Sequence, residues 1–142
     1  QSLSEAIYDP MNYLHDALYP VEHSRQAGAV LVAGSDAPVD SRDPRPFENM
    51  AAGIMKAAGS GDDFRASQRT SLTEMLAAYT INGARAVRQE AITGSIEAGK
   101  SADFIVLDRD LFALVKAGTP EQIAQTRVEQ TVFMGETVYR KP

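Results

Sequence analysis

Hydrophobic positions spaced three and four apart predict helices along the first two thirds of this chain. Residues 47–58 carry such a stripe between Pro46, which favours a helix start, and Gly59, which favours a helix end. Residues 21–27 form a shorter predicted helix that stops at Gly28. The methionines in the longer stripe are interpreted as core residues, because the flexible thioether fills irregular space between helices.

A third helix is predicted from its own start signal. Ser71 and Glu74 have the spacing of a capping box, in which each side chain accepts from the other residue's backbone N–H. Apolar residues then follow on one face as far as Tyr79. The Asn82-Gly83 pair is predicted to break this helix, and residues 84–90 to form a second short one.

One run of the chain has the pattern of a buried strand. Residues 29–33 are all small or branched apolar residues, which predicts a strand covered on both faces. The run ends at Gly34-Ser35, and Asp36 follows where the backbone must turn. In parallel α/β architectures the carboxyl ends of strands carry the chemistry, so Asp36 is the first candidate site residue. The alternative is that Asp36 only stabilises the turn before Pro38.

The pattern changes after residue 93, which predicts a boundary between residues 1–92 and residues 93–142. The second part is predicted to contain a strand, two short helices and a β-hairpin. Their predicted ranges are 102–107 for the strand, 111–117 and 120–126 for the helices, and 131–134 and 137–139 for the hairpin strands, joined at Gly135-Glu136.

Composition limits the classes of partner. The chain has 142 residues, a net charge of -5 and no cysteine. An acidic chain without a basic stripe is not expected to bind nucleic acid. Disulfides and thiolate metal sites are excluded. No apolar run approaches the ~18 residues of a membrane span, so no membrane partner is expected.

No complete active site can be assembled from local motifs. The two histidines, His15 and His23, have no metal-ligand spacing and are interpreted as surface or packing residues. Nucleophile elbows and phosphate-binding glycine loops are absent. Asp40 and Asp43 lie in a polar loop and are given little weight, whereas Asp103 and Asp108 are interpreted as turn formers.

Four segments together resemble the C-terminal part of the metal-dependent amidohydrolase superfamily, in the branch of the N-substituted formamide deformylases. Residues 32–38 are similar to the eighth barrel strand of that branch. Residues 71–84 resemble the last barrel helix, and residues 93–108, with the block Gly-Ser-Ile-Glu-Ala-Gly-Lys-Ser-Ala-Asp, resemble the return into a small β-sandwich. Residues 131–139 match the closing hairpin.

The resemblance implies an α/β fold consisting of part of a distorted (β/α)8 barrel and part of a β-sandwich. It also implies one or two divalent metals, usually zinc, at the mouth of the barrel. By the same match, Asp36 would bind metal and act as the base that activates the attacking water. The implied reaction is hydrolysis of a C–N bond in a small amide or cyclic amide.

The family's other ligands are not found in this sequence, and neither histidine matches their motifs. A barrel of this kind needs about 250 residues, more than the chain has. The expectation is therefore a C-terminal fragment of a longer hydrolase, inactive alone and without tightly bound metal. Its expected partners are the missing N-terminal part and further copies of itself. A non-catalytic oligomerisation module is the alternative. The compartment is left open, with the cytoplasm favoured.

Overall fold

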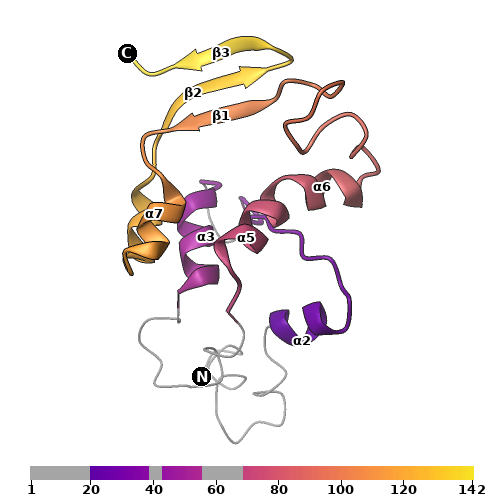
Figure 1. The fold of residues 1–142 in the computed structure, drawn as a ribbon, viewed down its shortest axis with the longest axis vertical. Coiled ribbons are helices and arrows are strands. Elements are labelled where there is room, and N and C mark those ends of the chain that lie inside the picture. Colours follow the sequence, from indigo (N-terminus) through magenta and orange to yellow (C-terminus); the bar gives the residue numbers. More distant parts are fainter. Residues whose placement is uncertain (1–19, 39–42, 56–68) are drawn as a thin grey trace, which may run out of the picture.

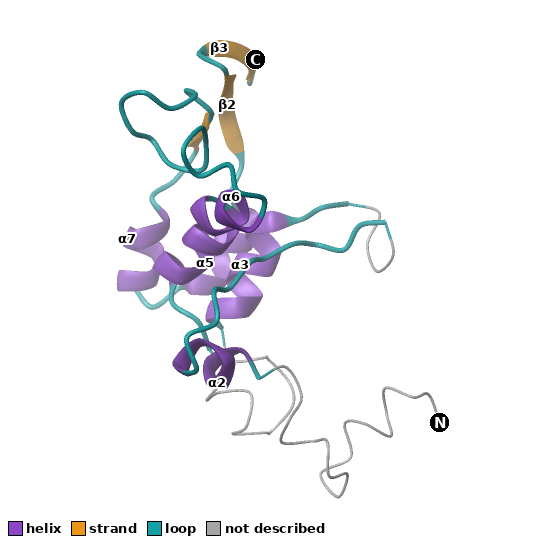
Figure 2. Ribbon diagram, turned by 90° about the vertical axis from the view of Figure 1, so that its right-hand side faces the viewer, coloured by secondary structure: helices purple, strands orange, loops and turns teal. Residues whose placement is uncertain are grey.

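The computed structural model describes residues 20–38, 43–55 and 69–142. Helices form one body, and a three-stranded antiparallel sheet lies at one end of it (Figures 1 and 2). The described elements are α2 (Val21–Gln26), α3 (Pro46–Ile54), α5 (Leu72–Tyr79), α6 (Ile81–Ala86), β1 (Phe104–Leu107), α7 (Leu111–Lys116), the 3-10 helix η2 (Pro120–Gln125), β2 (Val128–Phe133) and β3 (Glu136–Arg140).

Helix α3 begins at Pro46 as predicted but ends at Ile54, earlier than the predicted end at residue 58. Met55 is extended, with ψ of 150°. The carbonyl oxygen of Gly53 accepts from the backbone N–H of Thr70 at 3.0 Å and from its hydroxyl at 2.9 Å. A tertiary partner thus satisfies a terminal carbonyl that a further helical turn would otherwise use. Residues 56–58 lie outside the described part.

The capping box of α5 is confirmed. The Glu74 N–H donates to the Ser71 hydroxyl at 3.2 Å, and the Ser71 N–H donates to the Glu74 carboxylate at 2.8 Å. The break after α5 is at Thr80, however, so the predicted break at Asn82-Gly83 is wrong. Thr80 has φ of -130° and ψ of -100°, and its hydroxyl donates to the carbonyl of Leu76 at 2.6 Å. Such back-bonding by a threonine competes with the helical ladder.

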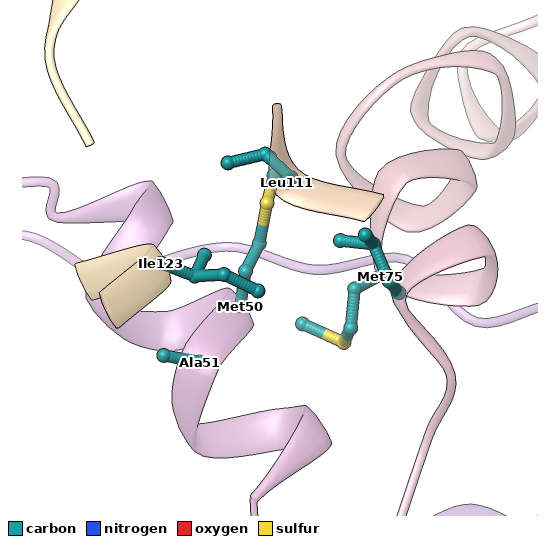
Figure 3. Close-up of a cluster of buried hydrophobic side chains, with 6 residues drawn as sticks. Met50, Ala51, Met75, Leu111 and Ile123 are labelled. Carbon is teal, nitrogen blue, oxygen red and sulfur yellow. The ribbon is translucent and has the colours of Figure 1, made fainter. Parts of the chain in front are cut away.

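The core lies between the helices. Six buried side chains from α3, α5, α7 and η2 converge there, and Figure 3 labels five of them. Leu111 and Ile123 belong to this core, although both follow the boundary predicted near residue 93. Met50 is buried in it and Met55 packs against it, which confirms that the methionines of the stripe 47–58 are core residues. The core residues are Met50, Ala51, Leu72, Met75, Leu111 and Ile123.

The sheet has the order β1-β2-β3. The hairpin turn lies at Met134 and Gly135, one residue earlier than predicted, with φ of 52° and 83°. Two successive left-handed residues are what a tight hairpin needs, because their twist matches that of the flanking strands. β2 therefore ends at Phe133, before the predicted last strand residue.

One face of the sheet is apolar and open. Ile105 pairs with Thr131, which in turn pairs with Tyr139, so these side chains share a face. Ile105 and Tyr139 are each 47% exposed, and Phe133 is 56% exposed. About half of each of these three apolar side chains is thus left open to solvent.

The strand predicted over residues 29–33 is corrected by the structure. The segment is extended but pairs with no strand among the described residues, and one of its faces is open. Leu31, Ala33 and Ser35 are half-buried, whereas Val30 is 61% and Val32 is 48% exposed. The apolar composition indicates that the segment prefers to be buried. A β-strand also needs adjacent strands whose backbone N–H and C=O groups hydrogen-bond to its own. The described part of the chain supplies none.

Candidate functional site

Asp36 lies at the end of the extended segment 29–35, which runs beside α5 and α6. Its backbone is left-handed, with φ of 51°, a conformation that aspartate tolerates better than most residues. The Ser35 hydroxyl accepts from the backbone N–H of Ala37 at 3.3 Å, and the following Ala37–Pro38 peptide bond is cis. The Asp36 side chain is exposed.

The segment begins at Ala29, whose N–H donates to the Ser24 carbonyl oxygen of α2 at 3.0 Å, and two further hydrogen bonds attach it to α5 and α6. The backbone N–H of Ala33 donates to the carbonyl oxygen of Ala78 at 3.2 Å. Asn82 Nδ2 donates to the carbonyl oxygen of Leu31 at 2.9 Å. Both bonds use backbone groups of odd-numbered residues, which point to the same edge of an extended segment. The even-numbered residues, which end in Asp36, form the exposed set.

Asp36 fits a metal ion as one ligand among several. Carboxylate oxygens are normal ligands of zinc and of harder divalent cations. The Asp36 carboxylate makes no hydrogen bond to another described residue, so its lone pairs are available. A complete donor set is not present in the described ranges, because no three histidine, cysteine, aspartate or glutamate side chains there come together.

None of the other candidate ligands joins Asp36 in a group of three possible metal ligands among the described residues. His23 lies exposed on α2, and Asp43 is exposed before α3. His15 and Asp40 lie outside the described residues.

In the part of the chain that the structure describes, no helix has the length and apolar character needed to cross a bilayer.

Asp103 and Asp108 have structural roles, but each joins segments that are far apart in the sequence and does not simply stabilise a local turn. Asp103 Oδ1 accepts from the Met134 N–H at 2.7 Å, and this bond is the largest cause that lowers the pKa of Asp103. Asp108 accepts two hydrogen bonds from Arg109 at 2.8 and 2.9 Å and one from the Arg127 N–H at 3.0 Å. The Arg109 guanidinium holds the pKa of Asp108 well below its usual range.

The block at residues 94–103, on which the family resemblance partly depends, is also structural. Gly94 has φ of 91°, and a Cβ there would lie 2.6 Å from the Cβ of Ala84 on α6. Lys100 Nζ donates to the Ser95 hydroxyl at 2.6 Å and to Glu97 at 3.2 Å. The Ser95 hydroxyl and Lys100 lower the pKa of Glu97. The block is therefore a loop packed against α6 and contributes no reactive group to Asp36.

A shallow apolar hollow of about 190 Å³ lies between α2 and the start of the extended segment, lined among others by Val21, Ala29 and Leu31. Asp36 is five positions beyond Leu31, roughly 16 Å further along an extended chain. This hollow is therefore not the surroundings of Asp36. A second, polar hollow is lined by Asp108, Arg109, Arg127 and Lys141. Arg109 is paired with Asp108, and Lys141 with Glu129.

The role of Asn82, which holds the segment that ends in Asp36, is not predicted by the sequence analysis. The Asn82-Gly83 pair predicts a helix break, whereas the structure places Asn82 in the first turn of α6. An asparagine in a helix, where its amide gains little from the helix itself, is the signal that suggests a tertiary partner.

Known proteins show what the chain is similar to. A profile of the amidohydrolase family matches residues 7–139. An N-substituted formamide deformylase from Arthrobacter pascens is 35% identical over 99 residues, which are 70% of this chain and 18% of that protein. The putative amidohydrolase YtcJ from Bacillus subtilis is 29% identical over 117 residues, 80% of this chain and 21% of that protein. The chain thus spans about a fifth of the length of these relatives.

A solved amidohydrolase from Thermotoga maritima MSB8 has the same fold over 96% of this chain, with a TM-score of 0.63 and 19% sequence identity. The match covers 30% of that structure. At this identity the likeness establishes the fold alone.

Proposed function

Because the chain belongs to the amidohydrolase family, we propose that the full-length protein containing it, the parent, hydrolyses a C–N bond of an amide or cyclic amide. The reaction would be metal-dependent, with zinc the expected ion. In the parent, residues 1–92 would complete the end of the barrel and residues 93–142 would form part of a β-sandwich. The N-substituted formamide deformylase among the relatives supports an amide as substrate class.

The alternating exposure of residues 30–36 is the observation that carries this proposal. In a β-barrel, one set of alternate side chains faces the interior and the other faces the surrounding helices. Here Leu31 and Ala33 contact the helical layer, and Val30 and Val32 are open. The open set would line the barrel interior, which brings Asp36 to the barrel mouth.

Asp36 would have two roles there. One carboxylate oxygen would serve as a metal ligand, and the carboxylate would also take the proton of the attacking water and pass it to the leaving nitrogen. A divalent metal, when bound, supplies a water whose pKa is lowered to about 7. The left-handed backbone at Asp36 turns the chain directly after the segment, so the carboxylate stands at its end.

The isolated chain would be inactive, because the remaining ligands would come from elsewhere in the parent. The open apolar face with Ile105, Phe133 and Tyr139 supports association, either with the N-terminal part of the parent or with a second copy. A non-catalytic oligomerisation module is the alternative for the chain alone. Light scattering after size-exclusion chromatography tests the association, and a monomer at low micromolar concentration would contradict it.

The activity is tested on the purified parent with a panel of N-substituted formamides and cyclic amides, following amine or carboxylate release and measuring bound zinc. Asp36→Asn should lower turnover by about 10²- to 10⁴-fold, the usual contribution of a general base. Glu90→Gln, at an exposed carboxylate that is not a candidate ligand, is the matched control and should leave turnover within about twofold. Unchanged turnover in Asp36→Asn would show that the base is misassigned.

A further inference from the structure

Apart from the bond between Ala29 and Ser24 at its start, the extended segment that ends in Asp36 has two hydrogen-bond attachments within the described ranges. One is between backbone groups, from the Ala33 N–H to the Ala78 carbonyl oxygen, which is one of the terminal carbonyls of α5. The other, at Leu31, depends on a side chain, that of Asn82, 51 residues further along the sequence. The two attachment points are two residues apart and lie on the same side of the segment.

The Asn82 amide is itself held in place. Arg85 Nη1 donates to Asn82 Oδ1 at 3.3 Å, one turn further along α6. With its oxygen engaged by Arg85, the amide presents its NH₂ group to the carbonyl of Leu31. Helix α6 is in turn packed against the loop at Gly94, where even a Cβ would be only 3.1 Å from Ile81 Cα. The donor therefore projects from a fixed helix.

We propose that Asn82 is a positioning residue for Asp36, an inference that rests on the proposed function. The bond to Leu31 fixes the rotation and register of the segment against α5 and α6. Because alternate side chains point to opposite faces, a slip of one residue would exchange those faces and carry Asp36 away from its place. Even a displacement of about 1 Å at a reacting group can cost about 10²-fold in rate.

Asn82→Asp in the parent is the most direct test. It keeps the size of the side chain but replaces the NH₂ donor with a carboxylate oxygen that cannot donate when ionised. We expect kcat to fall about 10- to 100-fold, whereas KM should stay within about twofold. The rate at which a chelator removes zinc should rise by a similar factor, because residues that orient metal ligands have effects of this size. Hydrogen exchange in the peptide 29–36 should also accelerate.

Two further variants complete the test. Asn82→Gln keeps an amide donor on a longer side chain and should recover part of the zinc retention. Val87→Ala is the control. Val87 directly follows α6 and is 65% exposed, so this variant should match the parent in every readout. If Asn82→Asp does not fold, Arg85→Ala is used in its place. Removal of the guanidinium that orients the Asn82 amide should change kcat, zinc retention and hydrogen exchange in the same direction but by less.

Parent-like kcat, zinc retention and exchange in Asn82→Asp would overturn the proposal, as would parent-like values in Arg85→Ala if that variant has to decide. The failure of the proposed function looks different. In that case the unaltered parent holds no zinc and hydrolyses no member of the panel, whereas the exchange of peptide 29–36 still reports on the Asn82 attachment. A parent that loses activity in Asp36→Asn but not in Asn82→Asp refutes only the positioning role.

Discussion

The backbone N–H of Met134 donates to Oδ1 of Asp103 at 2.7 Å, across 31 residues of sequence. Asp103 Oδ2 accepts from the Thr93 hydroxyl at 3.0 Å. One carboxylate therefore joins the loop after α6 to the tight turn between β2 and β3. Since the sheet makes few other contacts with the helices, this link helps to hold it in place (Figure 1).

The Asp103 link should depend on pH. The pKa of Asp103 is lowered below its ordinary value of 3.8, first by the hydrogen bond from the Met134 N–H. A depressed folded-state pKa contributes stability above 3.8, and this contribution is lost as pH falls through the folded value. Asp103→Asn removes the titration, so acid-unfolding curves should show a weaker loss of stability below pH 4. Parallel curves for the two proteins would contradict the link.

Gly94→Ala should destabilise the protein more than Gly118→Ala. Both glycines have positive φ, 91° and 76°, so both substitutions carry a similar backbone cost of about 1–2 kcal/mol. A Cβ at residue 94 also meets Ala84, whereas nothing lies within 4 Å at residue 118. The clash should add about 1–3 kcal/mol to the loss in free energy of unfolding, measured by urea denaturation.

The double variant Gly94→Ala/Ala84→Gly isolates the contact between the two residues. Removing the Ala84 methyl should recover part of the clash energy, which appears as a coupling term in a double-mutant cycle. Strictly additive losses would show that the loop moves away from α6 without cost.

Ser71→Ala should lower the free energy of unfolding by about 1 kcal/mol, because the N–H at Glu74 loses its acceptor. The ion pair between Arg25 and Glu74, with an N–O distance of 3.1 Å, stays in place. Thr73→Ala, at an exposed position in the same helical turn, is the control and should change stability by less than about 0.5 kcal/mol. Equal urea midpoints for both variants would argue against the cap.

Ile123→Ala should be among the most costly single truncations in the described core, because this side chain is 0% exposed. Loss of a buried isoleucine costs about 2–5 kcal/mol, depending on how far the core collapses into the cavity. Ile96→Ala removes the same atoms from a side chain that is 83% exposed and should have little effect. A thermal melt of both variants makes the comparison.

Local sequence signals were sufficient to predict structure wherever residues close in sequence supply one another's hydrogen-bond partners. The capping box at Ser71 and Glu74 needs only four consecutive residues, and it formed as the spacing predicts. The two hairpin strands were also predicted, although their turn lies one residue earlier. Helix ends were less predictable, since α3 stops where Thr70, 17 residues further along the chain, donates to the carbonyl oxygen of Gly53.

The sequence by itself determined the starts of α3 and α5, the two hairpin strands and the core methionines of residues 47–58. Asp36 stays a site residue predicted by family resemblance. Tertiary structure alone decided that residues 29–33 lack strand partners in the described chain and that Asn82 holds Leu31 rather than breaking a helix. The physical reason is how far apart in the sequence the interacting residues lie. Capping and periodicity act between residues a few positions apart, whereas a strand ladder or an amide anchor requires a partner that only folding brings within about 3 Å.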